Sequence, residues 1–137
     1  MRVAAHDQGY VKAPTGTVYK ALAEPSKYSA WWPRARARVR EGRLEVAFLD
    51  RRLCSVEMDR ERPGTGLVLE LGGALTGTLE WYLEAFPDGT IVNSILNLDV
   101  RGGRGRAARK LLRVRAALRR GMVALASAVE DPGRALL

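Results

Sequence analysis

Residues 104–130 read RGRAARKLLRVRAALRRGMVALASAVE, and their apolar side chains recur at the spacing of an amphipathic α-helix. One narrow stripe of the helical wheel contains Ala107, Leu111, Val114, Leu118, Met122, Leu125 and Val129. Asp131-Pro132-Gly133 ends the pattern, because proline cannot continue a helix. A helix of this length spans about 40 Å. Its apolar stripe therefore needs a partner surface elsewhere in the chain.

The same segment carries the net charge of the chain. Residues 101–120 contain nine arginines and lysines and no acidic residue, whereas the whole chain has a formal net charge of +8. The cations opposite the apolar stripe are Arg106, Arg109, Lys110, Arg113 and Arg120. Arg115 differs because it flanks the stripe. We expect Arg115 to pair with a ligand carboxylate or phosphate at the rim of the core, or else to lie over apolar surface with its head in water.

Length, composition and cysteine content describe one ordinary domain. A chain of 137 residues buries about two thirds of its unfolded surface, and we expect a single domain over residues 1–137. The chain has no apolar run of membrane-spanning length and no signal-peptide hydrophobic region. The single cysteine, Cys54, cannot form an internal disulfide, and we expect an inert core thiol. These features predict a cytoplasmic location.

The first third of the chain predicts one strand and two short helices. Residues 3–12 suit a strand, because they are mixed in polarity and are followed by a proline turn. Short helical segments are expected over residues 18–23 and 27–32. Pro25 and Pro33 end these two segments.

From residue 34 to residue 100 the apolar period changes to two, which is typical of strands with one buried face. Six such runs are separated by tight turns, among them Glu41-Gly42 and Pro87-Asp88-Gly89. A curved antiparallel sheet of about seven strands needs a cover for its apolar face, and only the helix at about 104–130 is long enough. The sequence therefore predicts an α+β fold in which the sheet wraps around the long C-terminal helix.

A local motif and the order of elements resemble the START-like helix-grip superfamily (SRPBCC), specifically its polyketide cyclase/dehydrase-like branch. The motif consists of Ala13-Pro14, Val18-Tyr19, Ala21-Leu22, Glu24-Pro25, Tyr28 and Trp31-Trp32-Pro33. Glu24 stands where aspartate is commoner in the family. Members bind lipids, sterols, quinones, plant hormones or polyketides, and many small bacterial ones have no assigned ligand. The resemblance implies a helix-grip fold with a buried apolar pocket and no metal or nucleotide cofactor, and the superfamily has no universal catalytic signature to carry over.

The predicted ligand site is the space between the sheet and the long helix. Its candidate lining residues are Trp31, Trp32, Phe48, Val56, Met58, Leu69, Leu79, Trp81, Asn93, Asn97, Leu111, Arg115, Leu118 and Met122. Trp31 and Trp32 are adjacent, so one is expected in the core and the other over it or at the cavity mouth. Trp81 is expected in the core with an indole N–H that needs a partner. Asn93 and Asn97 reach a ligand only if their face of the last strand points inward, and the alternation leaves that orientation open.

Three classes of function fit these features. The leading hypothesis is a protein, monomeric or homodimeric, that binds a small hydrophobic ligand such as a lipid or a polyketide-like molecule. A cyclase or dehydratase is the second, and its acid or base would be His6, Tyr10, Tyr82 or Asp99. The lone histidine excludes a histidine-based triad or metal cluster. A basic-surface module is the third, and an acidic membrane is favoured over nucleic acid because no nucleic-acid motif is present.

Overall fold

The computed structural model describes residues 1–130, and they contain the predicted order of one strand, two short helices, six strands and a long helix. The elements are β1 (Arg2–Val11), α1 (Thr15–Ala23), the 3₁₀ helix η1 (Pro25–Ala30), β2 (Arg36–Arg40), β3 (Arg43–Ala47), β4 (Cys54–Arg62), β5 (Gly66–Gly73), β6 (Gly77–Phe86), β7 (Gly89–Asp99) and α2 (Arg104–Glu130). The predicted stop at Asp131-Pro132-Gly133 lies outside the described residues.

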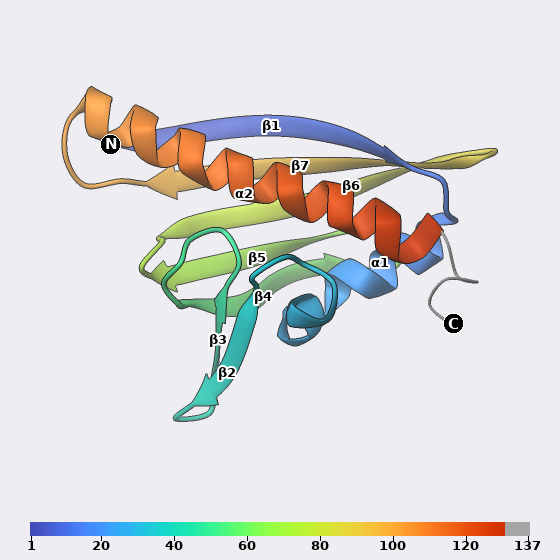
Figure 1. Ribbon diagram of the computed structural model, residues 1–137, viewed down its shortest axis with the longest axis horizontal. Helices are drawn as coiled ribbons and strands as arrows, with labels where there is room; N and C mark the ends of the chain where they lie inside the picture. Colours follow the sequence, from blue (N-terminus) through green and yellow to red (C-terminus); the bar gives the residue numbers. More distant parts are fainter. Residues whose placement is uncertain (131–137) are drawn as a thin grey trace.

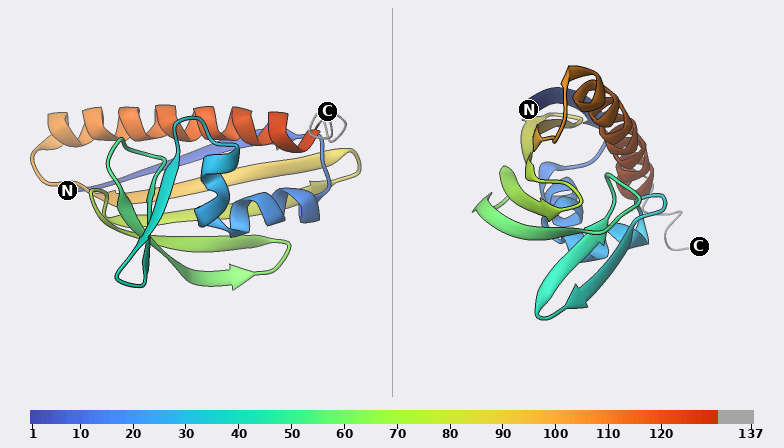
Figure 2. Two further views of the ribbon diagram at one scale, coloured as in Figure 1. Left: turned by 60° about the horizontal axis from the view of Figure 1, so that its bottom comes forward. Right: turned by 90° about the vertical axis from the view of Figure 1, so that its left-hand side faces the viewer.

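The seven strands form one antiparallel sheet in the order β1-β7-β6-β5-β4-β3-β2. The sheet curves, and α2 lies across its concave side, while the β2–β3 hairpin projects away from the helix (Figures 1 and 2). The predicted α+β helix-grip arrangement is thereby confirmed. The apolar face of the sheet is covered by the long helix, as its apolar stripe requires.

The first two helices begin earlier in the chain than the sequence predicts. The carbonyl oxygen of Pro14 accepts hydrogen bonds from the backbone N–H groups of Thr17 (3.0 Å) and Val18 (3.2 Å), so α1 starts at Thr15. The second segment starts at Pro25 instead of residue 27 and ends at Ala30. Proline is tolerated there because the first turn of a helix leaves its N–H groups without intrahelical partners. Trp31 and Trp32, which the sequence places inside the second helix, therefore follow its end.

The inner face of the sheet is identified by strand register and by burial. Asp7 of β1, Ser94 of β7 and Trp81 of β6 lie opposite one another in adjacent strands, so their side chains share one face. A Cβ placed on Gly9, which has the same parity as Asp7, would lie 3.6 Å from Sδ of Met122 in α2. This face therefore meets α2. The orientation of β7 is settled, because its inward residues are Val92, Ser94, Leu96 and Leu98, all at most 1% exposed.

The apolar stripe of α2 is confirmed as the side that packs on the sheet. Ala107, Val114, Leu118 and Leu125 are at most 1% exposed, and Met122 is 9% exposed. Leu111 and Val129 are half-buried at the edge of the same stripe. Among the cations of the opposite face, the exposed ones are Arg106, Arg109, Arg113 and Arg120. The helix is therefore amphipathic along its whole length.

Candidate functional site

Most of the predicted ligand-lining residues pack against one another between the sheet and α2. Those within the contiguous core, at most 9% exposed, are Trp32, Phe48, Val56, Leu69, Leu79, Trp81, Leu118 and Met122. Trp31 and Leu111 are half-buried and pack against this core. Such side chains fill the space between sheet and helix with their own volume, as is usual for a close-packed protein interior.

Aromatic rings concentrate at one end of this core, where η1 approaches α2. Trp32 contacts Tyr28, Phe48 and Trp81, with ring centroids 5.5, 5.1 and 6.4 Å away. Trp31 lies 5.5 Å from Trp32 and 5.3 Å from Tyr28 by the same measure. Trp32 is 2% exposed and Trp31 is half-buried. Of the two adjacent tryptophans, Trp32 is therefore the core residue and Trp31 lies over it.

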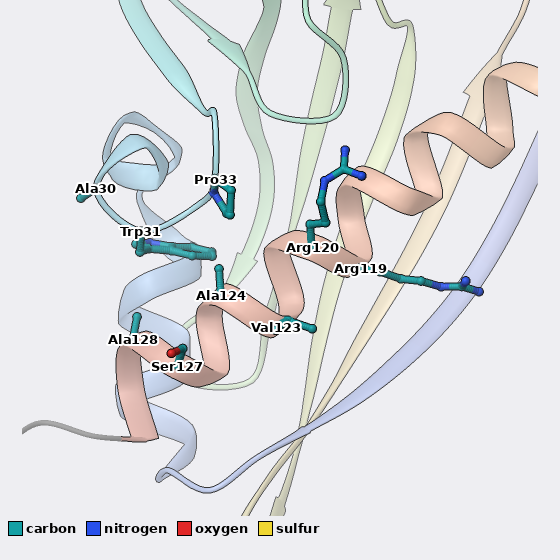
Figure 3. A pocket seen from close by; sticks show the side chains of 9 residues that line it. All are labelled: Ala30, Trp31, Pro33, Arg119, Arg120, Val123, Ala124, Ser127 and Ala128. Carbon is teal, nitrogen blue, oxygen red and sulfur yellow. The ribbon is translucent and has the colours of Figure 1, made fainter. Parts of the chain in front are cut away.

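An open groove of about 750 Å³ lies between α2 and the segment that follows η1, and we call it the Trp31 groove. It is lined by Ala30, Trp31, Pro33, Arg119, Arg120, Val123, Ala124, Ser127 and Ala128. Figure 3 shows the Trp31 ring lying over Ala124, while Arg119 and Arg120 leave the helix at the end of the groove away from Ser127. The walls are mainly apolar, and the volume falls within the roughly 300–1,000 Å³ typical of ligand sites.

A second hollow of about 460 Å³, which we call the basic pocket, lies farther toward the start of α2. It is lined by Trp32, Pro33, Arg34, Phe48, Leu49, Asp50, Arg51, Lys110, Arg113, Val114, Ala116, Ala117 and Arg120. Pro33 and Arg120 belong to both linings, so the two spaces adjoin. Apolar and aromatic side chains form part of this lining, and five cations with one carboxylate form the rest.

The carboxylate of the basic pocket is already paired. Nζ of Lys110 donates to Oδ2 of Asp50 at 2.6 Å, and the two side chains are only 15% and 19% exposed. Partial burial alone would raise the pKa of Asp50. The hydrogen bond and charge of Lys110, together with nearby backbone N–H groups, have the larger effect, so the pKa is lowered overall. Asp50 is therefore ionised at neutral pH, and Lys110 neutralises it.

Arg115 also pairs within the protein. Its Nε and Nη2 atoms donate to the two carboxylate oxygens of Asp7, at 3.1 and 2.7 Å, in a bidentate pair between α2 and β1. Nη2 of Arg119 lies 3.7 Å from the same carboxylate. The hydrogen bond from Arg115 lowers the pKa of Asp7 below its ordinary value, despite partial burial. The expectation that Arg115 is available to a ligand anion is corrected, because Asp7 occupies its guanidinium.

Two buried polar atoms of the inner face make no hydrogen bond among residues 1–130. They are Nε1 of Trp81 and Oγ of Ser94, on residues that lie opposite each other in β6 and β7. The sequence predicts an inward-facing Trp81 whose indole N–H needs a partner, and residues 1–130 supply none. Both residues are at most 1% exposed, so the atoms lie inside the core and not in either hollow.

Three predicted lining residues lie outside the space between the sheet and α2. Asn93 and Asn97 are on the face of β7 that points away from α2, so they do not project into the space beneath the helix. Oδ1 of Asn93 accepts hydrogen bonds from His6 (3.0 Å) and Gln8 (2.7 Å) on that outer face. Met58 is 41% exposed where the pairing of β4 with β5 changes register, and it stays out of the core. Strand alternation alone could not place these side chains, because both faces of β7 are partly apolar and a bulge interrupts β4.

The predicted acid or base candidates share the outer face of the sheet. His6, Tyr10, Tyr82 and Asp99 are exposed, and none of them lines the Trp31 groove or the basic pocket. Cys54 is 1% exposed, and burial raises the pKa of its thiol to about 11, so the thiol stays protonated and unreactive at neutral pH. Within residues 1–130 no cluster of three histidine, cysteine or acidic side chains could hold a metal ion. None of the helices described is long and apolar enough to cross a membrane.

Sequence reasoning missed most of the lining of the two hollows. Val123 and Ala124 lie outside the apolar stripe of α2, and the 49–51 segment falls between two predicted strands. The sequence contains one signal of the groove, because Val123 is an apolar residue on the polar side of the helical wheel. In the structure its side chain is 72% exposed. The opposing wall comes from the turn after η1, whose position relative to α2 depends on tertiary packing.

Comparison with known proteins identifies the fold. No protein-family model and no curated protein matches the sequence. The solved structure of the di-domain ARO/CYC protein StfQ from the steffimycin biosynthetic pathway matches 100% of this chain with TM-score 0.73 and 19% identity, over 53% of its own length. A START superfamily protein from Mycobacterium smegmatis matches 93% of this chain and 97% of its own, with TM-score 0.71 and 14% identity.

The Aha1 dimer from Colwellia psychrerythraea gives TM-score 0.68 at 15% identity, over 93% of this chain and 96% of its own. At these identities the likeness establishes the architecture alone. The chain has the helix-grip fold of START-like (SRPBCC) structures, as its sequence motif predicts. A fold of this kind supports many functions, and a function depends on the residues of a site, here those of the two hollows beside α2.

Proposed function

We propose that this helix-grip protein binds a small hydrophobic ligand in the Trp31 groove. The observation that carries the proposal is a largely apolar groove of about 750 Å³ between α2 and the turn after η1. Its walls offer the Trp31 ring on one side and Val123 and Ala124 on the other (Figure 3). Val123 is 72% exposed, so a ligand in the groove would remove part of its apolar surface from water.

The energy for binding would come from apolar burial. Each 100 Å² of apolar surface removed from water contributes about 2.5 kcal/mol. A flat ring or an acyl chain lying along the groove would cover apolar surface of both walls at once. Part of this gain offsets the loss of ligand translation and rotation, so the groove has to be covered over much of its length for useful affinity.

The groove is favoured over the interior because the interior is occupied by side chains. Trp32, Leu118 and Met122 are at most 9% exposed and pack between sheet and helix. A ligand placed there would have to displace large core residues, at a cost of several kcal/mol by analogy with disrupted cores. The Trp31 groove is open, and binding there leaves this packing intact.

The proposal is for binding and not for catalysis. Among residues 1–130, Asp50 is the only carboxylate in the lining of either hollow, and its pKa is lowered by its pairing with Lys110. A general acid needs a proton at neutral pH, and a general base needs a free lone pair near the substrate. The lowered pKa leaves Asp50 without a proton to donate at neutral pH and makes its carboxylate a weak base, and Lys110 and the Arg51 N–H already donate to its two oxygens.

A charged side chain placed on the apolar wall tests the site. We expect Val123→Glu to weaken binding of the methyl ester of cis-parinaric acid, a neutral fluorescent lipid, by at least about tenfold, because the ester would have to desolvate a carboxylate. Fluorescence titration of the purified protein measures the dissociation constant. Val123 is exposed, so the variant should keep its fold, which circular dichroism checks.

Leu112→Glu is the matched control. Leu112 is also an exposed apolar residue of α2, at 66%, and it lines neither hollow. The control should bind the ester as the wild type does. Saturable binding that is equal in all three proteins would place the ligand elsewhere, and no saturable binding to the wild type would rule out the proposal.

A further inference from the structure

The basic pocket directly continues the Trp31 groove along α2. Pro33 and Arg120 line both, with the Trp31 side apolar and the far side charged. A ligand longer than the groove would therefore leave an apolar environment and enter a basic one. The junction is fixed by the turn from Trp32 to Ala35, in which the Ala35 N–H donates to the Trp32 carbonyl at 3.1 Å.

Residues 1–130 do not neutralise the positive charge of the basic pocket. Lys110 and Asp50 compensate each other in their 2.6 Å pair. Four further cations complete the lining, namely Arg34, Arg51, Arg113 and Arg120, and none of these forms an ion pair with residues 1–130. Four guanidinium groups around one hollow repel one another, and an anion between them would relieve the repulsion.

The arginines come from three separate parts of the chain. Arg113 and Arg120 are seven residues apart on α2, so they lie on nearly the same side of the helix and about 10 Å apart along its axis. Arg34 comes from the turn after η1, and Arg51 comes from the segment between β3 and β4. Cations that converge from separate segments surround a small anion better than a row along one helix does.

Arg34 occupies a backbone conformation that arginine seldom adopts. Its φ is 65°, and it follows Pro33 in a turn closed by the Ala35 N–H. This is the third position of a type II turn, where glycine is the usual residue because it has no Cβ. The chain keeps a long cationic side chain here, at a cost in backbone energy, and places it at the rim of the basic pocket.

From these observations we infer that the ligand is an anionic amphiphile. This inference rests on the proposed function, because it assigns the apolar body of the ligand to the Trp31 groove and its carboxylate or phosphate head to the basic pocket. Pro33 and Arg120 lie at the junction between body and head. Guanidinium groups bind both kinds of head through charge-assisted hydrogen bonds.

A pair of probes that differ only in charge tests the inference. We expect cis-parinarate to bind the wild-type protein at least about tenfold more tightly than its methyl ester at low salt, since each charge-assisted hydrogen bond contributes about that factor. High salt should narrow the difference because ions screen the exposed arginines. The double variant Arg51→Gln/Arg113→Gln should bind the acid no better than the ester, with ester affinity unchanged.

Arg109→Gln is the control for a general loss of positive charge. Arg109 is an exposed cation of α2 that lines neither hollow, and its removal should leave the preference for the acid in place. Equal affinity of the wild type for acid and ester would overturn the inference and leave the proposed function standing. An equal loss of preference in the control and the double variant would also overturn it. Failure of both probes to bind would remove the proposed function and the inference together.

Competition identifies the head group. Dodecanoate and dodecyl phosphate are offered against bound cis-parinarate, with 1-dodecanol as the neutral analogue. Stronger displacement by either anion than by the alcohol supports the inference. The anion that displaces cis-parinarate more strongly identifies the preferred head group, carboxylate or phosphate. Displacement by the alcohol that matches both anions contradicts it.

Discussion

The ring of Trp32 lies against the backbone of α2 at Gly121, so closely that a Cβ on Gly121 would be 2.3 Å from the ring atoms Cε2 and Cζ2. Real side chains do not approach to that distance, so only glycine allows this contact. Gly121 belongs to the helix that the sequence predicts, and Trp32 belongs to the turn that forms one wall of both hollows. This contact therefore fixes the distance between the two walls that the proposed ligand would occupy.

Gly121→Ala should destabilise the protein even though alanine is the better helix former. The added methyl group would push Trp32 out of its packed position, which typically costs about 1–3 kcal/mol and outweighs a helix-propensity gain of about 1 kcal/mol. The urea-unfolding midpoint of the variant measures the difference. Gly105→Ala is the matched control, since a methyl group there would meet nothing within 4 Å and the midpoint should be equal or higher. A Gly121→Ala variant as stable as the wild type would show that Trp32 shifts at no cost.

The Asp7–Arg115 pair should make stability depend on pH in acid. The pKa of Asp7 is lowered in the folded protein, so the pair stabilises the fold above the unfolded value of about 3.9 and loses this contribution as pH falls through the lower folded value. Asp7→Asn should therefore lower the urea midpoint at neutral pH, and the gap to the wild type should shrink below about pH 4.

Asp59→Asn is the control for this pH dependence. Asp59 pairs with Arg60 at 3.7 Å on the surface, with side chains 45% and 80% exposed, and such pairs contribute little. Its urea midpoint should follow that of the wild type across the whole pH range. A constant gap between wild type and Asp7→Asn down to the lowest pH would mean that the Asp7 effect is not electrostatic.

The sequence predicted the large elements of the fold because each depends on a repeated pattern. The helix at 104–130 is recovered in full, and the six strands after residue 34 follow from the period of two. Strand parity placed Trp81 inward correctly, because its own strand alternates cleanly. It could not orient Asn93, because β7 is apolar on both faces and the decision depends on which face meets α2.

The candidate site was less predictable because it is built from single residues of distant segments. Arg115 was expected at a ligand, but its partner Asp7 lies 108 residues away and becomes a neighbour only when β1 packs beneath α2. The basic pocket joins Arg34 and Arg51 to the helix. The period of two was predicted to begin at Arg34, but β2 begins at Arg36 and Arg34 lies in the turn before it, while Arg51 lies between β3 and β4. The sequence does show the cluster of arginines and lysines in residues 101–120. Which of these cations pair with a carboxylate depends on tertiary packing.

Asn93 is expected to be a structural residue. It is 3% exposed on the outer face, accepts hydrogen bonds from His6 and Gln8, and donates to the Tyr82 carbonyl and to Glu84 at 3.2 and 2.9 Å. Asn93→Ala should lower stability by about 1–3 kcal/mol, since several partners lose a buried hydrogen-bonding group. Binding of cis-parinarate should be unchanged because Asn93 lies on the far side of the sheet from the groove.

Asn97→Ala is the control for this position. Asn97 shares the outer face of β7 but is exposed, so its replacement should change stability by no more than about 0.5 kcal/mol. Urea unfolding and fluorescence titration of both variants give the two readouts. A loss of affinity in Asn93→Ala without a loss of stability would assign Asn93 to the ligand after all.

Arg34→Gly should separate stability from binding. Glycine adopts the φ of 65° without strain, so the variant should gain up to about 1 kcal/mol in unfolding free energy, with part of the relief offset by the greater freedom of glycine in the unfolded chain. The same change removes one of four unpaired cations from the basic pocket, so affinity for cis-parinarate should fall while affinity for its methyl ester is retained. Arg34→Lys keeps both the charge and the strained backbone, and it should keep the wild-type stability and much of the preference for the acid. If Arg34→Gly becomes more stable and binds the acid as tightly as before, Arg34 is not part of the anion site.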